Sequence, residues 1–266
     1  MITTVIWAIV VLGALGLIFG ALLAVAGKVF AVETDPKEAA VRAACAGANC
    51  GACGYPGCDG YAAAVAKGEA PVNACVPGGA AAAEKIAEIM GVTAEAGERY
   101  VAFVRCSGTG EAMKKNFVYD GIPSCLAATR LGGGNGANAC AAGCMGFGDC
   151  VTACAFNAIR IVDGVAKVRR NKCVGCMKCA EACPKNLIVK VPATATDLVA
   201  CNSQEKGAAL RKFCEAGCIG CGICQKECPV DAIKVENNLA VIDQEKCVHC
   251  GHCADVCPRH VILDRR

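Results

Sequence analysis

Three stretches of the chain share one cysteine spacing that could carry iron–sulfur chemistry. They read CVGCMKCAEACP, CIGCGICQKECP and CVHCGHCADVCP, and each follows the pattern C-x2-C-x2-C-x3-C-P. In this pattern three thiolates grip one [4Fe–4S] cluster and the fourth reaches a neighbouring cluster. The chemistry predicted is one-electron transfer. The cysteines concerned are Cys173, Cys176, Cys179, Cys183, Cys218, Cys221, Cys224, Cys228, Cys247, Cys250, Cys253 and Cys257.

An internal duplication positions most of these cysteines. The cysteine offsets that begin at Cys140 recur 74 residues later, beginning at Cys214. The surrounding text agrees, because CAFNAIRIVDGVAKV is similar to CPVDAIKVENNLAVI. Each copy is predicted to be a two-cluster unit with a β-hairpin and short helices after the cysteine runs. The units are expected at residues 140–192 and 214–266, and the hairpins at 159–162 with 165–168 and at 233–235 with 239–242.

The first copy lacks one regular ligand. The counterpart of Cys221 is Phe147, and Cys140 is predicted to replace the missing thiolate. By the shared-ligand rule, each copy then contains two ligand sets. In the first copy these are Cys140, Cys144, Cys150 and Cys183, and Cys154, Cys173, Cys176 and Cys179. In the second copy they are Cys218, Cys221, Cys224 and Cys257, and Cys228, Cys247, Cys250 and Cys253.

A further group of cysteines lies closer to the N-terminus. Its spacing is C-x2-C-x4-C-x16-C, and glycines between the first three cysteines let the backbone turn tightly. Residues 61–67 and 80–90 are expected to be helical. The sequence therefore predicts a small helical domain at residues 43–95 that binds one [4Fe–4S] cluster through Cys50, Cys53, Cys58 and Cys75. Cys45 lies outside the spacing and is expected to be a spare or buried thiol.

Of the 25 cysteines, a few are not used by these five clusters. Cys106 and Cys201 have similar neighbours, in VRCSG and VACNS. One hypothesis is a sixth [4Fe–4S] cluster between the two copies, and the alternative is a set of buried structural thiols. The ligands of the sixth cluster would be Cys106, Cys125, Cys201 and Cys214. Disulfide and zinc-only frameworks are disfavoured, because neither explains a shared fourth cysteine before proline.

The rest of the sequence offers little other chemistry. No nucleophile, general base or dinucleotide-binding motif stands out, since GGGNG at residues 132–136 does not lie between a strand and a helix. No catalytic residue is therefore assigned, and the three histidines, His249, His252 and His260, are expected not to bind iron. The net charge of +3 does not favour nucleic acid as a partner.

Basic residues surround the cysteine motifs of the first copy. They would form either a docking face for an acidic electron donor or an ordinary solvated face. These residues are Arg169, Arg170, Lys172, Lys178 and Lys185.

The N-terminal segment is apolar. Residues 2–26 contain no charged side chain, and this length is sufficient for a helix that spans a bilayer. A cleaved signal peptide would begin with a positive region, which this segment lacks. We expect a transmembrane anchor at residues 1–30 and a linker at 31–42. Lys28, Lys37 and Arg42 follow the span, so the remainder is expected on the cytoplasmic side, where cysteines stay reduced.

An apolar anchor, the text NCGACGYPGCDGYA with a later cysteine and PGG, and tandem cluster motifs together resemble the B subunit of the Rnf complex over nearly the whole chain. That family belongs to a membrane-bound ferredoxin:NAD oxidoreductase that couples electron flow to ion translocation. The resemblance implies a single-pass protein of the cell membrane. It would relay electrons from soluble ferredoxin towards other membrane and peripheral subunits, which reduce NAD and translocate Na+ or H+.

The expected fold class is α+β, with an N-terminal transmembrane helix, a small helical [4Fe–4S] domain and two tandem ferredoxin units. Connecting segments are expected at residues 96–139 and 193–213. The extra ferredoxin motifs are similar to the longer, polyferredoxin members of the family. Two other functions stay open: an electron relay in a related complex that reduces a redox-sensing regulator, and a membrane-tethered polyferredoxin that serves a hydrogenase or another dehydrogenase.

Overall fold

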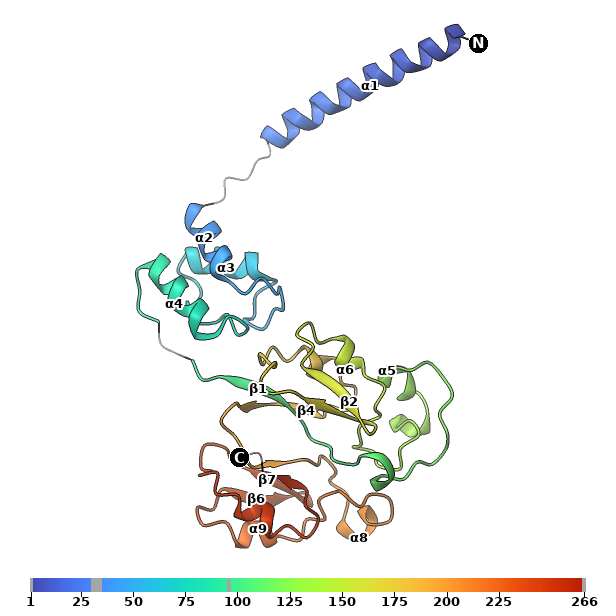
Figure 1. Cartoon of the computed structure of the whole chain (residues 1–266), viewed down its shortest axis with the longest axis vertical. Coiled ribbons are helices and arrows are strands. Elements are labelled where there is room, and N and C mark those ends of the chain that lie inside the picture. Colours follow the sequence, from blue (N-terminus) through green and yellow to red (C-terminus); the bar gives the residue numbers. More distant parts are fainter. Residues whose placement is uncertain (1, 30–34, 95–96, 265–266) are drawn as a thin grey trace.

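The apolar N-terminal segment forms one long helix. The computed structural model describes residues 2–29, 35–94 and 97–264. Helix α1 (Ile2–Val29) extends away from the rest of the molecule, as Figure 1 shows, and its large apolar side chains are exposed. By length and composition, its stretch Val5–Lys28 is able to cross a membrane. The predicted helix is therefore present, and the linker predicted at 31–42 lies partly outside the described residues.

Three helices form the domain after the linker: α2 (Pro36–Ala44), α3 (Cys58–Ala66) and α4 (Gly79–Met90). Helix α2 begins after Asp35, whose side chain accepts the backbone N–H of Lys37 at 2.8 Å. Val41, Tyr61 and Ile86, one from each helix, are at most 1% exposed and form a common core. This domain is helical, as predicted.

The first copy contains the hairpin that its turn sequence predicts. Strands β2 (Ile159–Val162) and β3 (Val165–Val168) are antiparallel, and Val162 pairs with Val165. Asp163 and Gly164 connect them with φ values of 48° and 79°, as a two-residue turn of this type requires. The short helices α6 (Asp149–Thr152) and α7 (Lys178–Glu181) follow cysteine motifs.

The second copy repeats these elements. Its hairpin joins β6 (Ile233–Glu236) to β7 (Leu239–Ile242), one residue longer in β6 than predicted. Helices α9 (Ile223–Lys226) and α10 (His252–Asp255) correspond to α6 and α7. Both predicted hairpins are confirmed.

Each copy has a second sheet that the sequence did not predict. Strand β1 (Tyr100–Val104) pairs with β4 (Ile188–Pro192), and β5 (Leu198–Val199) pairs with β8 (Ile262–Leu263). Strands β1 and β5 come from the segments expected only to connect the domains. They pair antiparallel with the strand that ends each copy. The pairing therefore packs the upstream chain against a unit whose own residues end with β4 or β8.

The two ferredoxin units are joined by backbone contacts (Figure 1). Lys114 N donates to Phe213 O at 2.8 Å, and Glu215 N donates to Ala112 O at 2.7 Å. Ser107 Oγ donates to the carbonyls of Ala200 and Ala216 in the second unit. The remaining short elements lie around this junction: η1 (Gly110–Ala112), α5 (Cys125–Ala128), η2 (Gly132–Gly134) and α8 (Gly207–Leu210).

Candidate iron–sulfur centres

The N-terminal domain encloses a cavity lined by Cys50, Cys53, Cys58 and Cys75, the set predicted from spacing. Gly51, Gly54 and Gly57 have φ values of 70°, 86° and 95°, so the loop that carries three of these cysteines turns at each glycine. Asn49 Oδ1 accepts the backbone N–H of Cys58 at 2.8 Å and fixes the end of this loop at helix α3. We call this group quartet 1.

A second cavity lies beside β1 in the first unit. It is lined by quartet 2: Cys154, Cys173, Cys176 and Cys179. Two backbone N–H groups point at its sulfur atoms, since Ala158 N lies 3.3 Å from Cys154 Sγ and Ala102 N lies 3.3 Å from Cys173 Sγ. Such N–H donors stabilise negative charge on a thiolate or on a cluster sulfur. The structure brings together the four cysteines that the shared-ligand rule groups.

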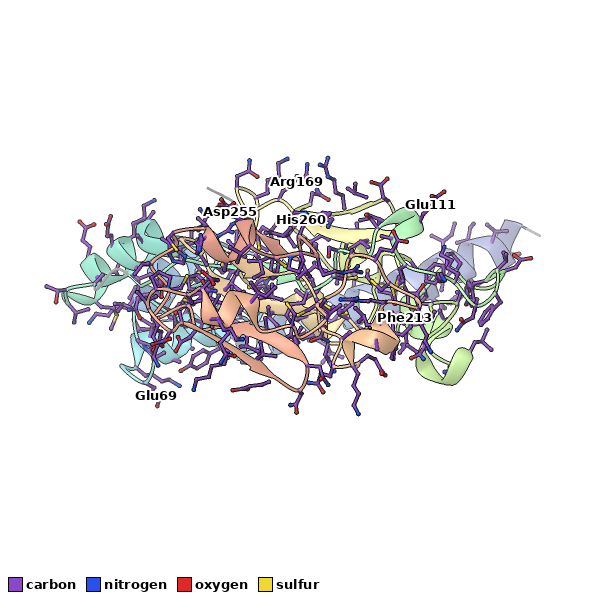
Figure 2. The ribbon with its side chains drawn as sticks, turned by 90° about the horizontal axis from the view of Figure 1, so that it is seen from below. Glu69, Glu111, Arg169, Phe213, Asp255 and His260 are labelled. Carbon is purple, nitrogen blue, oxygen red and sulfur yellow. The ribbon has the colours of Figure 1, made fainter. Side chains whose placement is uncertain are left out.

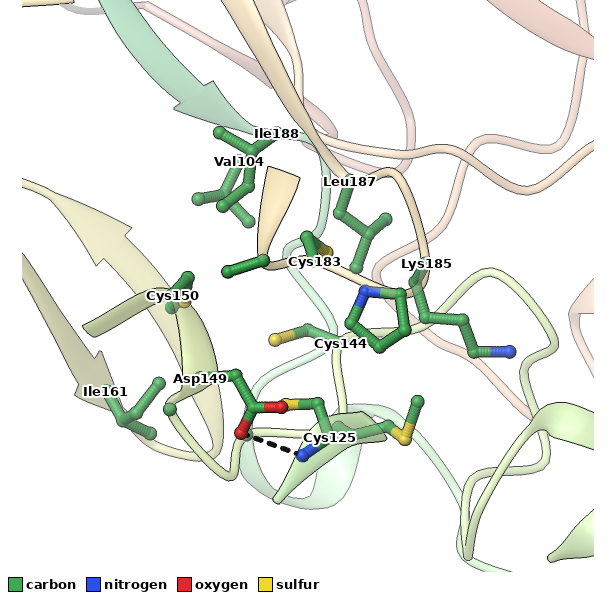
Figure 3. Close-up of a pocket in the computed structure, with 16 residues that line it drawn as sticks. Val104, Cys125, Cys144, Asp149, Cys150, Ile161, Cys183, Lys185, Leu187 and Ile188 are labelled. Atoms are coloured by element: carbon green, nitrogen blue, oxygen red, sulfur yellow. Dashed lines mark hydrogen bonds between the residues drawn. The ribbon is translucent and has the colours of Figure 1, made fainter. Parts of the chain in front are cut away.

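The next cavity differs from the predicted grouping. It is lined by quartet 3, which consists of Cys125, Cys144, Cys150 and Cys183, as Figure 3 shows. Cys125 takes the place predicted for Cys140. Gly143 N donates to Cys140 O at 3.1 Å in a tight turn, and this turn separates Cys140 from Cys144, so the two cysteines line different cavities. The predicted set of Cys140 with Cys144, Cys150 and Cys183 does not match this arrangement.

Asp149 holds Cys125 in this cavity. Its carboxylate accepts the backbone N–H groups of Cys125 and Leu126 and the hydroxyl of Ser124, each at 3.0 Å (Figure 3). Burial opposes ionisation, but these hydrogen bonds outweigh it and lower the pKa of Asp149 below its usual range. Sequence analysis missed Asp149, although its position directly before Cys150 and its difference from Ile223 in the second copy were visible.

Quartet 4 lies at the junction of the two units. Its cavity is lined by Cys106, Cys140, Cys201 and Cys214. The predicted sixth set contained three of these residues, with Cys125 in place of Cys140. The duplication explains the observed set, because Cys140 matches Cys214 and Cys106 has the same place beyond β1 that Cys201 has beyond β5. Each copy therefore contributes an equivalent pair.

The second copy contains two further quartets. Quartet 5 lines one cavity and consists of Cys218, Cys221, Cys224 and Cys257. Quartet 6 consists of Cys228, Cys247, Cys250 and Cys253, in which Ala232 N lies 3.4 Å from Cys228 Sγ, as in quartet 2. Burial, followed by the charges of Asp197, Cys228 and Cys250, raises the pKa of Cys247, so these side chains lie near one another. Cys221 and Cys250 are the exposed members.

The cavities suit a cluster and not free thiolates. Burial raises the pKa of Cys150, of Cys179 and of Cys253 to about 12. Without iron these thiols are protonated at neutral pH, and iron must displace their protons to form thiolate bonds. Four converging sulfurs without a carboxylate or imidazole in the set are the donors that a [4Fe–4S] cluster takes. Figure 2 shows the sulfur atoms inside the molecule and charged side chains such as Glu69 and Glu111 outside.

Neighbouring quartets approach one another in a fixed order. Burial, and then the charge of Cys50, raises the pKa of Cys176, which links quartets 1 and 2. Burial and nearby Cys179 act in the same way on Cys150, which links quartets 2 and 3. Cys144 N lies 3.5 Å from Cys106 Sγ, which links quartets 3 and 4.

The order continues into the second unit. Burial is the largest cause of the raised pKa of Cys218, and Cys201 of quartet 4 adds to it, which links quartets 4 and 5. Cys224 similarly contributes to the raised pKa of Cys253, after burial, and links quartets 5 and 6. The six quartets therefore follow one another in single file.

Most of the basic residues considered as a docking face have internal partners. Arg170 Nη2 donates to Ala193 O at 2.7 Å, Lys185 Nζ donates to Ala141 O at 2.7 Å, and Arg169 donates to Asn157 O. Lys172 and Lys178 are exposed. Three of the five predicted residues thus hold backbone carbonyls within the unit.

Known protein families match the cysteine-rich regions of this chain. Residues 46–77 match a family described as a putative Fe-S cluster, and residues 172–232 and 217–261 match a 4Fe-4S dicluster domain. These matches include quartet 1 and most of the motifs of the two copies.

Full-length relatives are also similar, and each is the B subunit of a membrane complex. The one from the Na(+)-translocating ferredoxin:NAD(+) oxidoreductase complex of Acetobacterium woodii is 45% identical over 95% of this chain and 75% of the relative. The one from the ion-translocating oxidoreductase complex of Methanosarcina acetivorans is 38% identical over 96% of both chains. The one from the proton-translocating ferredoxin:NAD(+) oxidoreductase complex of Clostridium ljungdahlii is 46% identical over 92% of this chain and 86% of the relative.

Proposed function

This chain belongs to the family of B subunits of ion-translocating oxidoreductase complexes, the Rnf complexes, and we propose that it is the electron-transfer subunit of such a complex. Of the functions that the sequence left open, the relatives favour this one over a regulator-reducing complex or a hydrogenase polyferredoxin. Two relatives are named for ferredoxin and NAD, and by extension we propose ferredoxin as the electron donor here and NAD as the acceptor on another subunit.

The single-file order of the six quartets carries this proposal. Each quartet would hold one [4Fe–4S] cluster, which supplies a one-electron carrier when bound. The residues of this chain bind the clusters, exclude water from them and keep neighbouring sites close. Quartet 4 is the necessary junction, because it alone lies between the two ferredoxin units and takes two cysteines from each side.

The ends of the file suggest a direction. Quartet 1 belongs to the domain that follows α1 directly, which we propose as a membrane anchor with the cluster domains on the cytoplasmic side. Quartets 5 and 6 lie at the other end and contain the exposed cysteines Cys221 and Cys250. We propose that electrons enter at quartets 5 and 6 and leave from quartet 1 towards membrane subunits. The relatives' names differ in the translocated ion, so the ion stays open for this chain.

The first test is the metal content of the anaerobically purified full chain. Six clusters correspond to about 24 iron and about 24 sulfide per chain, since each cluster holds four of each. A Cys106→Ala, Cys201→Ala variant should contain about 20 of each, because both cysteines belong to quartet 4. Zinc without sulfide would contradict the proposal.

The order of the quartets is tested with the same variant. Reduced ferredoxin should reduce all clusters of the unaltered chain rapidly. In the variant it should reduce only the two clusters of the second unit rapidly, which low-temperature electron paramagnetic resonance counts. Equal rates for all remaining clusters would refute quartet 4 as the junction.

A further inference from the structure

A buried carboxylate lies beside quartet 6. Asp197 precedes β5 and is 0% exposed. Thr196 Oγ1 donates to its Oδ2 at 3.2 Å, whereas its Oδ1 has no hydrogen-bond partner among the described residues. Ligand atoms of Asp197, Cys247 and His249 all lie within 4.8 Å of one another. An ionisable group in such a position is costly to bury, so it calls for a function.

The first copy provides a matched position without this carboxylate. Arg105 N donates to Leu187 O, and Ala200 N donates to Val261 O, each at 2.8 Å. These two contacts occupy the same place in the two copies, because Leu187 and Val261 are related by the duplication.

Counting back three residues along each strand from these contacts aligns Asp197 with Ala102. Ala102 is 3% exposed and lies beside Cys173, to which its backbone N–H donates. The duplication also aligns His249 with Gly175, whose Cβ would lie only 2.5 Å from Tyr100 O. Quartet 2 therefore has Ala102 and Gly175 where quartet 6 has a carboxylate and an imidazole.

Asp197 faces two cysteines of quartet 6. Burial, and then the charge of Asp197, raises the pKa of Cys247 and also that of Cys253. Gln244 Nε2 donates to Asp197 O at 3.1 Å and fixes the backbone, so the side chain stays directed at the quartet. A cluster on these cysteines would take up one electron, and thus one negative charge, next to this carboxylate.

We propose that Asp197 sets the reduction potential of the cluster on quartet 6 and makes it lower than that of the equivalent cluster on quartet 2. The inference rests on the proposed function, since it concerns one site of the relay. The step concerned is the uptake of one electron from a low-potential iron–sulfur donor, with no bond formed or broken. A fixed negative charge a few ångströms away in a poorly solvated site disfavours that uptake. Electrons that arrive at quartet 6 then pass on to quartet 5 downhill in energy.

The test is a redox titration of the full chain with Asp197→Asn, followed by electron paramagnetic resonance. The substitution removes the charge and keeps the shape. One of the one-electron waves should move to higher potential by about tenfold or more in its equilibrium constant, or about 59 mV. Adding Asp197→Asn to a Cys250→Ala variant, which removes the cluster concerned, should shift no wave and so identify the site.

Two further variants complete the experiment. Asp197→Ala installs the residue of the first copy and should shift the same wave upward, which covers a failure of Asp197→Asn to fold. Asp255→Asn removes an exposed carboxylate from helix α10 beside Cys253 and should have little effect, because water screens its charge.

Two results would overturn the inference. An unchanged potential with full iron content would show that the carboxylate does not act on the cluster. A downward shift would show that the carboxyl is a neutral hydrogen-bond donor. Both results leave six loaded clusters and hence the proposed relay intact, whereas missing clusters in the unaltered chain would refute the relay itself.

Discussion

The carboxylate of Asp149 accepts the backbone N–H of Cys125 at 3.0 Å and so joins a loop of the upstream segment to the first ferredoxin unit. This contact supplies the sulfur that quartet 3 lacks at Phe147, the counterpart of Cys221. The ring of Phe147 instead packs against Tyr119 of the same upstream segment, with ring centroids 5.0 Å apart. A ligand lost from a motif is thus replaced by one from a distant loop.

Replacing Asp149 should release the cluster of quartet 3. Asp149→Ala leaves two N–H groups and one hydroxyl without their acceptor, and helix α5 then no longer holds Cys125 in place. We expect the loss of about four iron per chain, or a much faster loss to a chelator. Asp120→Ala, an exposed carboxylate of the same segment, is the control and should retain all iron. Full iron retention by Asp149→Ala would argue against the anchoring role.

Paired cysteine substitutions distinguish the two groupings of the first copy. Cys125→Ala with Cys144→Ala should remove only one cluster, or about four iron, because both residues belong to quartet 3. Cys140→Ala with Cys144→Ala should remove about eight iron, because the residues line different cavities. The grouping predicted from the sequence expects the reverse. Iron analysis of the two double variants decides between them.

Cys45 should be the reactive thiol of the cluster-loaded chain, because it lies outside all six quartets. Burial raises the pKa of Cys45 to about 11. Since only the thiolate reacts, alkylation should be slow at pH 8 and accelerate by about tenfold per pH unit up to that pKa. Mass spectrometry after iodoacetamide treatment measures the rate, and Cys45→Ser should abolish the labelling. A second labelled cysteine would indicate an incomplete quartet.

Iron removal should affect the domains unequally. The core of the second unit contains Cys201, Cys218, Cys224, Cys253 and Cys257 among few aliphatic residues, so cluster bonds supply much of its stability. The N-terminal domain has Val41, Tyr61 and Ile86 in a core of its own. Hydrogen exchange of the iron-free chain should therefore show protected amides in α3 and α4 and unprotected amides in β6 and β7. Equal protection in both regions would contradict this account.

The sequence predicted those parts of the site that depend on local spacing. In a C-x2-C-x2-C run the cysteines lie within a few residues, so the chain has little choice but to direct them at one point, and quartets 1, 2, 5 and 6 have their predicted members. The hairpins were equally accessible, because Asp163-Gly164 and Asn237-Asn238 adopt the left-handed turn from local preference alone.

Sequence alone determined that this chain has an apolar N-terminal helix, a helical cysteine domain and two related copies of a ferredoxin pattern. Only the tertiary structure decided that Cys125 joins quartet 3, that Cys140 joins Cys106, Cys201 and Cys214, and that Asp197 faces quartet 6. Repetition identifies equivalent residues, but it does not say which distant segments meet. Those meetings depend on the pairing of β1 with β4 and of β5 with β8, whose hydrogen bonds join residues too far apart in sequence for any local spacing to reveal.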